Sequence, residues 1–588
     1  IDMPIVDSLR IYAETDRNNR LGEPVIKPVK TLVNNIKGDL LIDRPNNKSG
    51  IKLADEYPKI NSYEDSYVYY DKKSIQKGAY EKEHFYFHLD PFSIDSLDNF
   101  DNDQLRFKGE MMSAGIFPDF KETLTLQPDH SLGFIRETPS GGFPMYGGKG
   151  TYHDTIRLSN EGLRGNGELK YIASTTYSND FIFAPDSMNA IAQNFEIEKS
   201  PIKVQFPPVE GKNVETRWLP KKDIMYHKEI DQPIAMYDMQ SFMSGKTMIQ
   251  PDGLSGVGTF EFQKAELSSN LMRFQFSDFS ADTADFNLKS GKLGGEESTY
   301  DFKTVNVNAY ITFEERYGEF KSNGGGSFVS FDPVEYICYM EEFKWYMDND
   351  NLELSAGETS STDASGVKLD GAQFISTKEG QDSLSFFSTK AKYDLKHKRI
   401  YADGVKFINV ADAMVYPDSG RVVLDKGADM NTLYNSKVIA NYITKNHNIY
   451  NATINIFGQR KYSGRGYIDY IDELEKKQAI YLQKIAVDMT GQTFATAEIK
   501  DTANFTLSSN YEFYGGVKLF SSNKNLTFNG YSRIVHDCDL LAKNLFSFEQ
   551  EIDPKEIYLP IDSATKDVSG NPLTTNMFLS PKILIVAL

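Results

Sequence analysis

A tandem repeat is the feature that most constrains what this chain can fold into. The segment Gly162-Leu163-Arg164-Gly165-Asn166-Gly167 returns 91 residues later as Gly253-Leu254-Ser255-Gly256-Val257-Gly258. The spacing holds downstream, because Phe183 and Phe195 recur at the same offset as Phe274 and Phe286. Alternating apolar positions follow each Gly-x-Gly pair, as in β-strands. Two structural units of one kind therefore lie in tandem, and repeated β-units build scaffolds and grooves more often than catalytic pockets.

The charge balance narrows the choice of partners. The 588 residues include 64 Lys and Arg against 83 Asp and Glu, a net charge of −19. Such a chain repels a phosphate backbone, so we expect no nucleic acid partner. No run of about eighteen apolar residues occurs, so we expect no transmembrane helix. Aromatic residues make up 13% of the chain and are mostly Tyr and Phe, which suits half-buried strand faces.

The two cysteines and the chain ends leave several questions open. Cys338 and Cys538 are too few for a disulfide-dense module, and we expect two buried thiols, although one long-range bridge is an alternative. The chain opens at Ile1-Asp2-Met3-Pro4, which neither shows nor refutes a removed signal peptide. The apolar closing segment, residues 583–588, is too short to span a membrane and reads as a buried strand or as the place where a longer chain was cut.

The chain divides by pattern into four regions. We expect an irregular β-rich region over 1–104, two tandem Gly-x-Gly β-units over 105–300, a loop-rich aromatic and acidic segment over 301–385, and regular strands over 386–588. A helix is one reading of residues 73–82, but Gly78 interrupts it. The sequence that follows, residues 84–89, reads as a strand, and so does Leu105 to Gly109.

Glycine-rich and polar stretches predict turns and loops. We expect each Gly-x-Gly pair to permit a turn or a bulge between strands, because the flanking residues alternate with period two. A dinucleotide-binding loop would need a helix after the glycines, and we consider it the weaker reading. The Gly-rich stretch 322–327 and the polar stretch 357–366 are the best loop candidates. The latter has no large apolar residue to anchor it, so we expect a flexible excursion there.

The region after residue 386 has a regular strand-turn-strand rhythm. Residues 391–395 lead through a short turn into 399–408, and residues 413–416 turn at Pro417-Asp418-Ser419-Gly420 into 421–425. Such rungs place one row of side chains inward and leave the other row in water. A further match in the sequence is the pair Gly466-Tyr467, which recurs as Gly530-Tyr531 at an offset of 64 residues.

These residues carry a resemblance to known families. The segment from Ala391 to Leu433 resembles the OstA-like (LptA-type) repeats of lipopolysaccharide-transport proteins, and the matching residues are Ala391, Tyr393, Asp394, Ile400, Ala402, Gly404 and Val405. The Gly-Leu-x-Gly-x-Gly units are similar to the strand-turn motifs of TamB/AsmA-type envelope proteins. The resemblance implies an all-β fold, an elongated β-solenoid or stacked open β-jellyroll (β-taco-like) with tandem repeats. It also implies a periplasmic or outer-membrane-associated location, with the cell surface as a variant, in a Gram-negative bacterium. The frequent Asn, Lys, Tyr and Ile suit a Bacteroidota species.

Few residues are spaced for metal or catalytic chemistry. His84 and His88 lie in a predicted strand, where residues four apart are about 13 Å apart, so we expect no metal there. His536 and Cys538 share a strand face but have no located third ligand, and we expect ordinary burial. The acidic stretches 98–103 and 348–351 read as solvated turns, and calcium is the metal they would suit. No hydrolase signature such as Gly-x-Ser-x-Gly or His-Glu-x-x-His occurs. We therefore predict no catalytic, cofactor-binding or metal-binding residues.

Two functional hypotheses follow. The first is a non-enzymatic envelope protein, either a structural scaffold or a lipid-transport-like subunit of an outer-membrane assembly or secretion complex, with envelope protein subunits and lipid as partners. The second is a surface-exposed carbohydrate-binding or adhesion protein that uses aromatic loops, notably Trp345-Tyr346 beside Glu341 and Glu342. A carbohydrate-active enzyme is a distant third.

Overall fold

The structure is a computed structural model, and it is all-β. It describes residues 6–44, 46, 56–97, 102–290, 300–324, 327–356, 360–362, 368–537, 543–573, 576–580 and 583–587. The strands pair antiparallel in the described part of the chain, and 42 of them belong to one hydrogen-bonded sheet. The chain divides into two compact units, residues 1–281 and 282–588. Among the described residues, no helix has the length and apolar character needed to cross a membrane.

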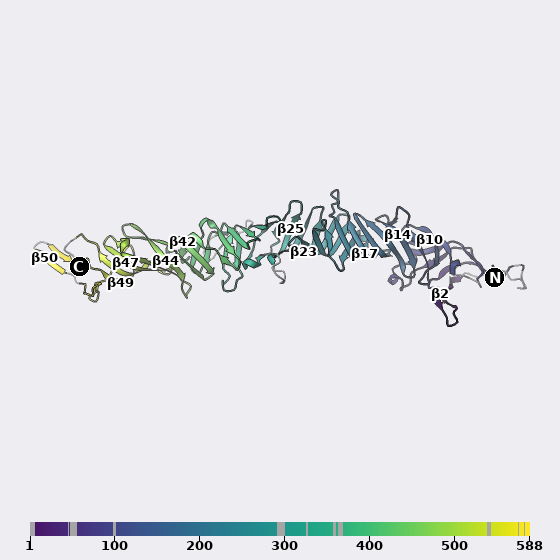
Figure 1. Cartoon of the computed structure of the whole chain (residues 1–588), viewed down its shortest axis with the longest axis horizontal. Coiled ribbons are helices and arrows are strands. Elements are labelled where there is room, and N and C mark those ends of the chain that lie inside the picture. The colour runs from purple at the N-terminus through teal and green to yellow at the C-terminus, as the bar shows by residue number, and fades with distance from the viewer. Residues whose placement is uncertain are drawn as a thin grey trace. The chain divides into compact units, whose positions relative to one another are not determined.

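Unit 1 contains the predicted repeat, and Figure 1 shows its strands side by side from β10 to β17. Its last strand, β24, continues into the first residues of unit 2. Short 3-10 turns interrupt the strands at η1 (Gln76–Gly78), η2 (Asn102–Gln104) and η3 (Pro220–Lys222). The strands are β1 (Val6–Leu9), β2 (Tyr12–Asn18), β3 (Pro24–Pro28), β4 (Val33–Ile36), β5 (Gly38–Leu41), β6 (Lys59–Ser62), β7 (Ser66–Tyr69), β8 (Phe85–Leu89), β9 (Ser93–Ile94), β10 (Phe107–Ser113), β11 (Phe120–Leu126), β12 (Leu132–Glu137), β13 (Phe143–Met145), β14 (Gly150–Ser159), β15 (Gly162–Tyr171), β16 (Ser174–Ala184), β17 (Ser187–Ile197), β18 (Val209–Leu219), β19 (Ile224–Glu229), β20 (Ile234–Met236), β21 (Ser241–Gln250), β22 (Gly253–Phe262), β23 (Ala265–Phe274) and β24 (Asp278–Lys289).

Unit 2 contains strands of 2 to 13 residues. Its 3-10 turns are η4 (Asp332–Val334), η5 (Asp418–Gly420) and η6 (Asp501–Ala503). The strands are β25 (Tyr300–Thr312), β26 (Tyr317–Ser322), β27 (Val329–Phe331), β28 (Tyr336–Cys338), β29 (Glu342–Tyr346), β30 (Asn351–Ser355), β31 (Ser360–Thr362), β32 (Lys368–Asp370), β33 (Ala372–Ser376), β34 (Ser385–Ser388), β35 (Lys390–Asp394), β36 (Arg399–Asp403), β37 (Ile408–Val410), β38 (Ala413–Tyr416), β39 (Val422–Asp425), β40 (Asp429–Met430), β41 (Leu433–Ala440), β42 (His447–Gly458), β43 (Lys461–Ile471), β44 (Lys477–Val487), β45 (Thr493–Ile499), β46 (Thr506–Ser508), β47 (Tyr511–Phe520), β48 (Leu526–Ile534), β49 (Phe546–Ile552), β50 (Asn576–Ser580) and β51 (Ile583–Ala587).

The 91-residue repeat is confirmed strand by strand. The starts of β13 to β17 coincide with those of β20 to β24 when the offset is applied. In both copies the pairing register shifts at the Gly-x-Gly, between Gly165 and Gly167 and between Gly256 and Gly258. The predicted bulge is therefore present. The dinucleotide reading is excluded, because an antiparallel strand and not a helix follows the glycines.

Close side-chain packing explains the central glycine of each repeat. A Cβ on Gly165 would lie 2.3 Å from the Tyr152 hydroxyl and 2.9 Å from the Phe183 ring. These two rings, on β14 and β16, reach over the glycine of β15 with centroids 5.2 Å apart. In the second copy, Phe274 lies 2.8 Å from the corresponding position on Gly256. The small residue is therefore required by the inward packing of its neighbours.

Rows of the sheet are often made of two short strands in place of one long one. Strands β12 and β13 both pair with β14, and strands β19 and β20 both pair with β18 on one side and β21 on the other. In unit 2, β26 and β27 pair with β25 in the same way. A few residues outside the sheet separate the two halves of such a row, and both halves keep their hydrogen bonds to the neighbouring long strand.

The strand rhythm predicted after residue 386 is confirmed except over 399–408, where the expected strand ends at Asp403 and a new strand, β37, begins at Ile408. Strands β35 and β36 carry the resemblance residues Ala391, Tyr393, Ile400 and Ala402 on the buried face, and Gly404 follows with a positive φ of 74°. The sequence match at an offset of 64 residues also has a structural counterpart. Tyr450 stacks on Tyr467 across β42 and β43, and Tyr514 stacks on Tyr531 across β47 and β48.

Of the other sequence predictions, some are confirmed, one is wrong and some fall outside the described residues. The helix considered over 73–82 is only the short turn η1, because Lys77 has a positive φ of 59°. Strand β8 confirms the strand expected over 84–89, and Cys338 is buried as expected. Cys538, the loop stretches 357–359 and 363–366, and Leu588 lie outside the described residues. The division into four regions remains a prediction, and the boundary between the two compact units falls within the region 105–300.

Candidate interaction groove

The outward face of unit 2 carries ladders of alternating charge. Directly opposite residues on β26, β29, β30 and β35 are Glu319, Lys344, Glu353 and Lys392. Because opposite positions in an antiparallel pair are about 5 Å apart, unlike charges can meet there. The Lys344 ammonium lies 2.5 Å from the Glu319 carboxylate, and this hydrogen bond raises the pKa of Lys344.

A second ladder runs beside the first. It consists of Lys321, Glu342, Ser355, Lys390 and Asp403 on the same strands and on β36. Lys321 pairs with Glu342 at 3.1 Å, and Arg421 pairs with Asp403 at 2.7 Å. The two ladders therefore form a checkerboard in which most charges have an opposite neighbour.

The residues between the ladders point to the other side of the sheet. Phe320, Phe343, Leu354 and Ala391 are buried and directly opposite one another in the same register. The rings of Phe320 and Phe343 stack with centroids 4.4 Å apart and planes 7° apart. Strict alternation of charged and apolar residues thus fixes which face of these strands meets water.

The charged face is hollowed into a groove of about 580 Å³. The groove crosses five strands, and at about 4.8 Å per strand its length is on the order of 19 Å. Within the described part of the chain, neither Lys390 nor Lys392 forms an ion pair within 4.0 Å, although Asp403 lies directly opposite Lys390 and Glu353 directly opposite Lys392. The lining residues are Glu319, Phe320, Lys321, Glu342, Phe343, Lys344, Glu353, Leu354, Ser355, Lys390, Ala391, Lys392 and Asp403.

Sequence reasoning missed this groove, although a signal was present. The triplet Glu-Phe-Lys occurs twice, at 319–321 and at 342–344, and places opposite charges two residues apart around a phenylalanine. In strands that pair antiparallel, the two triplets face each other head to tail, so each Glu meets a Lys. Recognising the ladder requires knowing that β29 pairs with β26, which the intervening β27 and β28 hide in the sequence.

The aromatic loop predicted to hold carbohydrate is not a loop. Trp345 and Tyr346 end strand β29, and Trp345 is only 3% exposed, with its ring 5.6 Å from that of Phe286. Tyr346 lies on the outward face, and its hydroxyl donates to the Glu353 carboxylate at 3.4 Å. The prediction that Trp345 stacks on a sugar is therefore wrong, because the alternation of this strand turns it into the core.

The structure does not bring together the residues that were considered as metal ligands. His84 precedes β8, while His88 lies within it, stacks on Tyr67 and is 3.4 Å from Asp65. Asp348 pairs with Arg316 in the turn between β29 and β30. Asp98 to Asp101 and Cys538 lie outside the described residues. Among the residues that the structure describes, no three His, Cys, Asp or Glu side chains form a group able to hold a metal.

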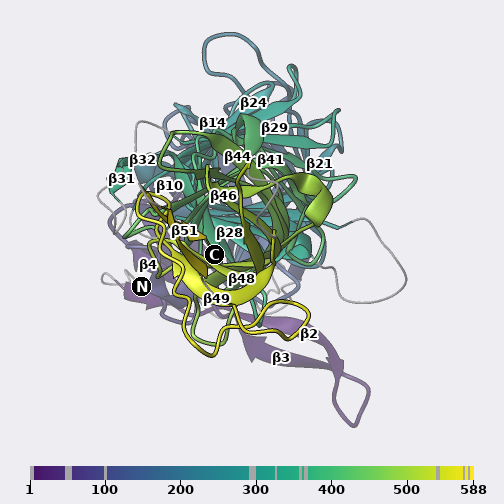
Figure 2. The same cartoon turned by 90° about the vertical axis from the view of Figure 1, so that its left-hand side faces the viewer.

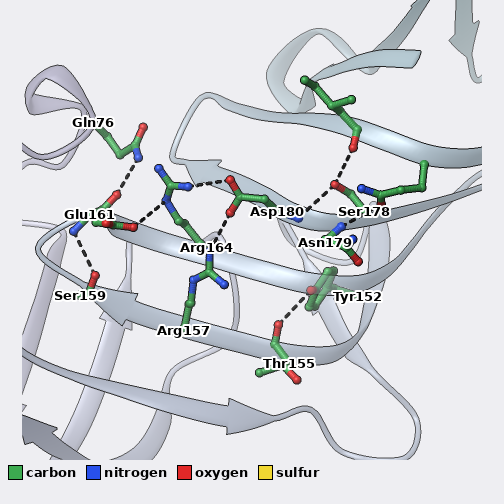
Figure 3. Close-up of polar contacts among 12 residues, drawn as sticks. Gln76, Tyr152, Thr155, Arg157, Ser159, Glu161, Arg164, Ser178, Asn179 and Asp180 are labelled. Carbon is green, nitrogen blue, oxygen red and sulfur yellow. Dashed lines mark hydrogen bonds and ion pairs between the residues drawn. The ribbon is translucent and has the colours of Figure 1, made fainter. Parts of the chain in front are cut away.

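A second polar cluster, in unit 1, is a structural clamp (Figure 3). Arg157 and Arg164 are directly opposite across β14 and β15, where like charges repel. Asp180 on β16 resolves this repulsion, because its two carboxylate oxygens accept from Arg157 at 2.9 Å and from Arg164 at 2.6 Å. Gln76 of η1 donates to the Glu161 carbonyl at 2.7 Å beside the cluster. The Asp180 carboxylate thus binds both arginines and ties strands β14, β15 and β16 together.

No family model matches the chain. No curated protein matches it either. The fold and the surfaces described above therefore carry the functional argument.

Proposed function

We propose that this protein is a non-enzymatic structural subunit of a cell-envelope assembly, built as a stacked open β-jellyroll, whose outward faces contact other subunits. The observation that carries this proposal is the filled interior of both units. In unit 1, the fully buried Trp218 packs against Tyr146 and Tyr171 at 5.0 and 4.8 Å. In unit 2, the inward row from Phe320 to Ala391 is likewise occupied by the chain's own side chains.

A packed interior favours a scaffold over a lipid conduit. A protein that carries acyl chains along its sheet must leave inward apolar positions accessible, whereas here the large side chains at these positions interdigitate. The outward ladders offer many polar contacts without a large apolar surface, which suits subunit contacts. Lipid transport and carbohydrate binding remain predictions without a located site.

The proposed location is the periplasm or the outer membrane of a Gram-negative bacterium. It rests on the resemblance of the segment from Ala391 to Leu433 to the lipopolysaccharide-transport repeats, and strands β35 and β36 have the strand-turn-strand form that those repeats share. The groove would then be a polar contact surface for an envelope protein, in which the exposed ammonium groups of Lys390 and Lys392, which form no ion pair within the described residues, are free to meet carboxylates of the partner.

The test is copurification of the tagged chain from gently solubilised membranes of its source organism. We expect outer-membrane proteins to copurify with the wild type and to be reduced with the double variant Lys390→Glu/Lys392→Glu. The matched control is Lys500→Glu/Lys555→Glu, which makes the same charge change at exposed lysines outside the groove. Recovery of the wild type alone, as a soluble protein without envelope partners, would count against the proposal. Stoichiometric bound lipid found by mass spectrometry would replace the scaffold with a lipid carrier.

A further inference from the structure

A row of tyrosines crosses the outward side of unit 2. Strands β41 to β44 are consecutive in the sheet and lie side by side (Figures 1 and 2). Tyr450, Tyr467 and Tyr481 are directly opposite one another on β42, β43 and β44. Their ring centroids are 6.1 and 5.0 Å apart, and Tyr467 and Tyr481 are 37% and 39% exposed. The fold therefore leaves much of this row open to water.

Exposed cations surround the tyrosine row. Among the residues that the structure describes, none of four such cations forms an ion pair, although all four lie on the outward side of β41, β43 or β44. Two of them contact aromatic rings instead, because Lys461 lies over Phe457 and Lys484 over Phe494, with the ammonium groups 5.9 and 5.6 Å from the ring centroids. The four cations are Lys437, Lys461, Arg465 and Lys484.

The acidic residue on this side of the sheet is already bound. Asp469 is the one Asp or Glu within strands β41 to β44. Its carboxylate accepts from the Tyr450 hydroxyl at 2.7 Å and binds the Lys477 ammonium at 2.6 Å. Residues 433–487 contain eight Lys and Arg against four Asp and Glu, whereas the rest of the chain has 56 against 79. We call the outward side of β41 to β44 the basic tyrosine face.

The sequence match at an offset of 64 residues shows that the fold does not need these free cations. Tyr531 belongs to a similar stacked pair, across β47 and β48. There the position that corresponds to Arg465 is Asn529, and the neighbouring cations Lys518 and Arg533 both form ion pairs. The same arrangement of tyrosines thus folds with its cations neutralised. The cations of the basic tyrosine face are therefore available to a ligand outside the chain.

The shape and composition of the face fit a protein. None of its residues lines the groove described above, whereas sites for small ligands are concave. Tyrosine and arginine are enriched at the centres of protein interfaces, and here Tyr467 and Arg465 lie two residues apart on β43 with lysines around them. Four strands of about ten residues cover on the order of 650 Å², close to the roughly 800 Å² per partner of a specific interface.

A single-stranded nucleic acid fits this face less well. Bases stack on open faces of aromatic rings. Tyr450 and Tyr467 stack on each other with planes 26° apart, so one face of each ring is already covered. The net charge of −19 also repels a phosphate backbone at longer range. A polypeptide that carries carboxylates meets neither obstacle.

We propose that the basic tyrosine face docks an acidic surface of a different protein, with Arg465 and Lys484 bound to its carboxylates and Tyr467 at the centre of the contact. Opposite charges across an interface steer the partners together and fix their register. Two copies of this chain paired face to face would bring the same cations together, so the partner is not a second copy. The inference rests on the proposed scaffold function, and it adds a second contact surface and the chemistry of the subunit that covers it.

The first test measures binding of fluorescent poly-L-glutamate to the purified full chain by fluorescence anisotropy. We expect binding that weakens with salt, because exposed charges are screened. The double variant Arg465→Glu/Lys484→Glu should weaken it by at least about tenfold, since carboxylates would then face carboxylates. Circular dichroism of each variant checks the fold.

The chain offers a matched control for each substitution. Arg217→Glu/Lys212→Glu makes the same change of net charge on β18, where both residues are exposed and form no ion pair within the described residues. It should leave the binding of poly-L-glutamate unchanged. Tyr531→Ala is the control for Tyr467→Ala, because Tyr531 is 39% exposed and also lies in a stacked pair.

The second test identifies the partner in cells of the source organism. A photo-reactive amino acid replaces Gln483, which is exposed beside Lys484. We expect an adduct with one protein, linked through a peptide rich in Asp and Glu. Arg465→Glu/Lys484→Glu and Tyr467→Ala should each remove the adduct, and the controls should keep it. Changing the linked carboxylates of the partner to Lys should restore the adduct of the double variant.

Three outcomes overturn the inference. They are equal effects of the two double variants on the binding of poly-L-glutamate, an adduct formed only with a second copy, a nucleic acid, a glycan or a lipid, and an absence of any adduct at position 483. A chain that copurifies with outer-membrane proteins but gives no adduct there would end this inference and leave the scaffold proposal standing. An acidic partner protein from outside the envelope would do the reverse.

Discussion

His227 is a titratable residue that lies in the interior of unit 1. Its imidazole is fully buried on β19 and stacks on Phe195 with centroids 3.5 Å apart. The ring has little hydrogen bonding, because the Thr176 hydroxyl is 3.5 Å from Nε2 and Nδ1 has no hydrogen-bond partner among the described residues. Burial disfavours the charged ring and lowers the pKa of His227 to about 3. The side chain therefore serves as a neutral packing group.

This burial predicts a pH dependence of stability. In the unfolded chain the imidazole has a pKa near 6.5, so between about pH 6.5 and pH 3 the unfolded state binds a proton that the folded state does not. Stability from this site is fully present above pH 6.5 and falls as the pH is lowered, by at most about 1.4 kcal/mol per pH unit. Urea unfolding of the wild type and of His227→Leu at several pH values should show a smaller acid slope in the variant. Equal slopes, or an equal effect of His153→Gln at a half-buried position, would contradict this account.

At the scale of elements, a buried tyrosine latch marks each copy of the repeat. The Tyr146 hydroxyl donates to the carbonyls of Ala184 and Ser187 at 2.9 and 3.2 Å. Tyr237, 91 residues later, makes the same bonds to the carbonyls of Gln275 and Asp278 at 3.1 and 2.8 Å. Each latch ties the turn after a short strand, β13 or β20, to the turn between two long ones. Burial raises the pKa of both hydroxyls, so they stay protonated donors.

Removing a latch should cost stability with little change in shape. Tyr146→Phe and Tyr237→Phe keep the ring but remove the hydroxyl donor from part-buried carbonyl groups, and each should lower the free energy of unfolding by about 1 kcal/mol. Denaturant unfolding measures this loss, with Tyr558→Phe as the control because Tyr558 is exposed and its substitution should change little. A loss confined to one of the two repeats would show that the latches are not equivalent.

The latch also shows what the sequence could and could not reveal. The glycine repeat, its bulges and the strands around it follow from spacing and alternation, which are local properties. Tyr146 and Tyr237 keep the repeat offset, but Gly147-Gly148 follows one and Asp238-Met239 the other, so the match is easily passed over. Trp345 was predictable as a core residue, since Phe343 and Trp345 alternate with Glu342 and Lys344. The groove depends on the pairing of β26 with β29 and of β30 with β35, strands that lie apart in the sequence, and no local pattern encodes such pairings.

At the scale of the whole molecule, strand β24 decides where unit 1 can be cut. It spans the unit boundary, and its buried Phe279 packs against Phe260, Phe262 and Phe274 with centroids 4.8, 5.5 and 5.8 Å apart. Asp278, its first residue, also supplies one carbonyl to the Tyr237 latch. A cut before β24 would therefore expose an aromatic cluster and break the second latch at once.

We accordingly expect a fragment of residues 1–290 to fold and a fragment of residues 1–277 to fail. The longer fragment keeps the inward row of β24, whereas the shorter one exposes three phenylalanine rings beside an open strand edge, a combination that promotes aggregation. Circular dichroism, thermal unfolding and light scattering of both fragments measure the difference. The longer fragment should unfold cooperatively, and the shorter one should scatter light or unfold at a lower temperature. Equal behaviour of the two would mean that β24 contributes nothing to unit 1, and the second copy of the repeat would then end at β23.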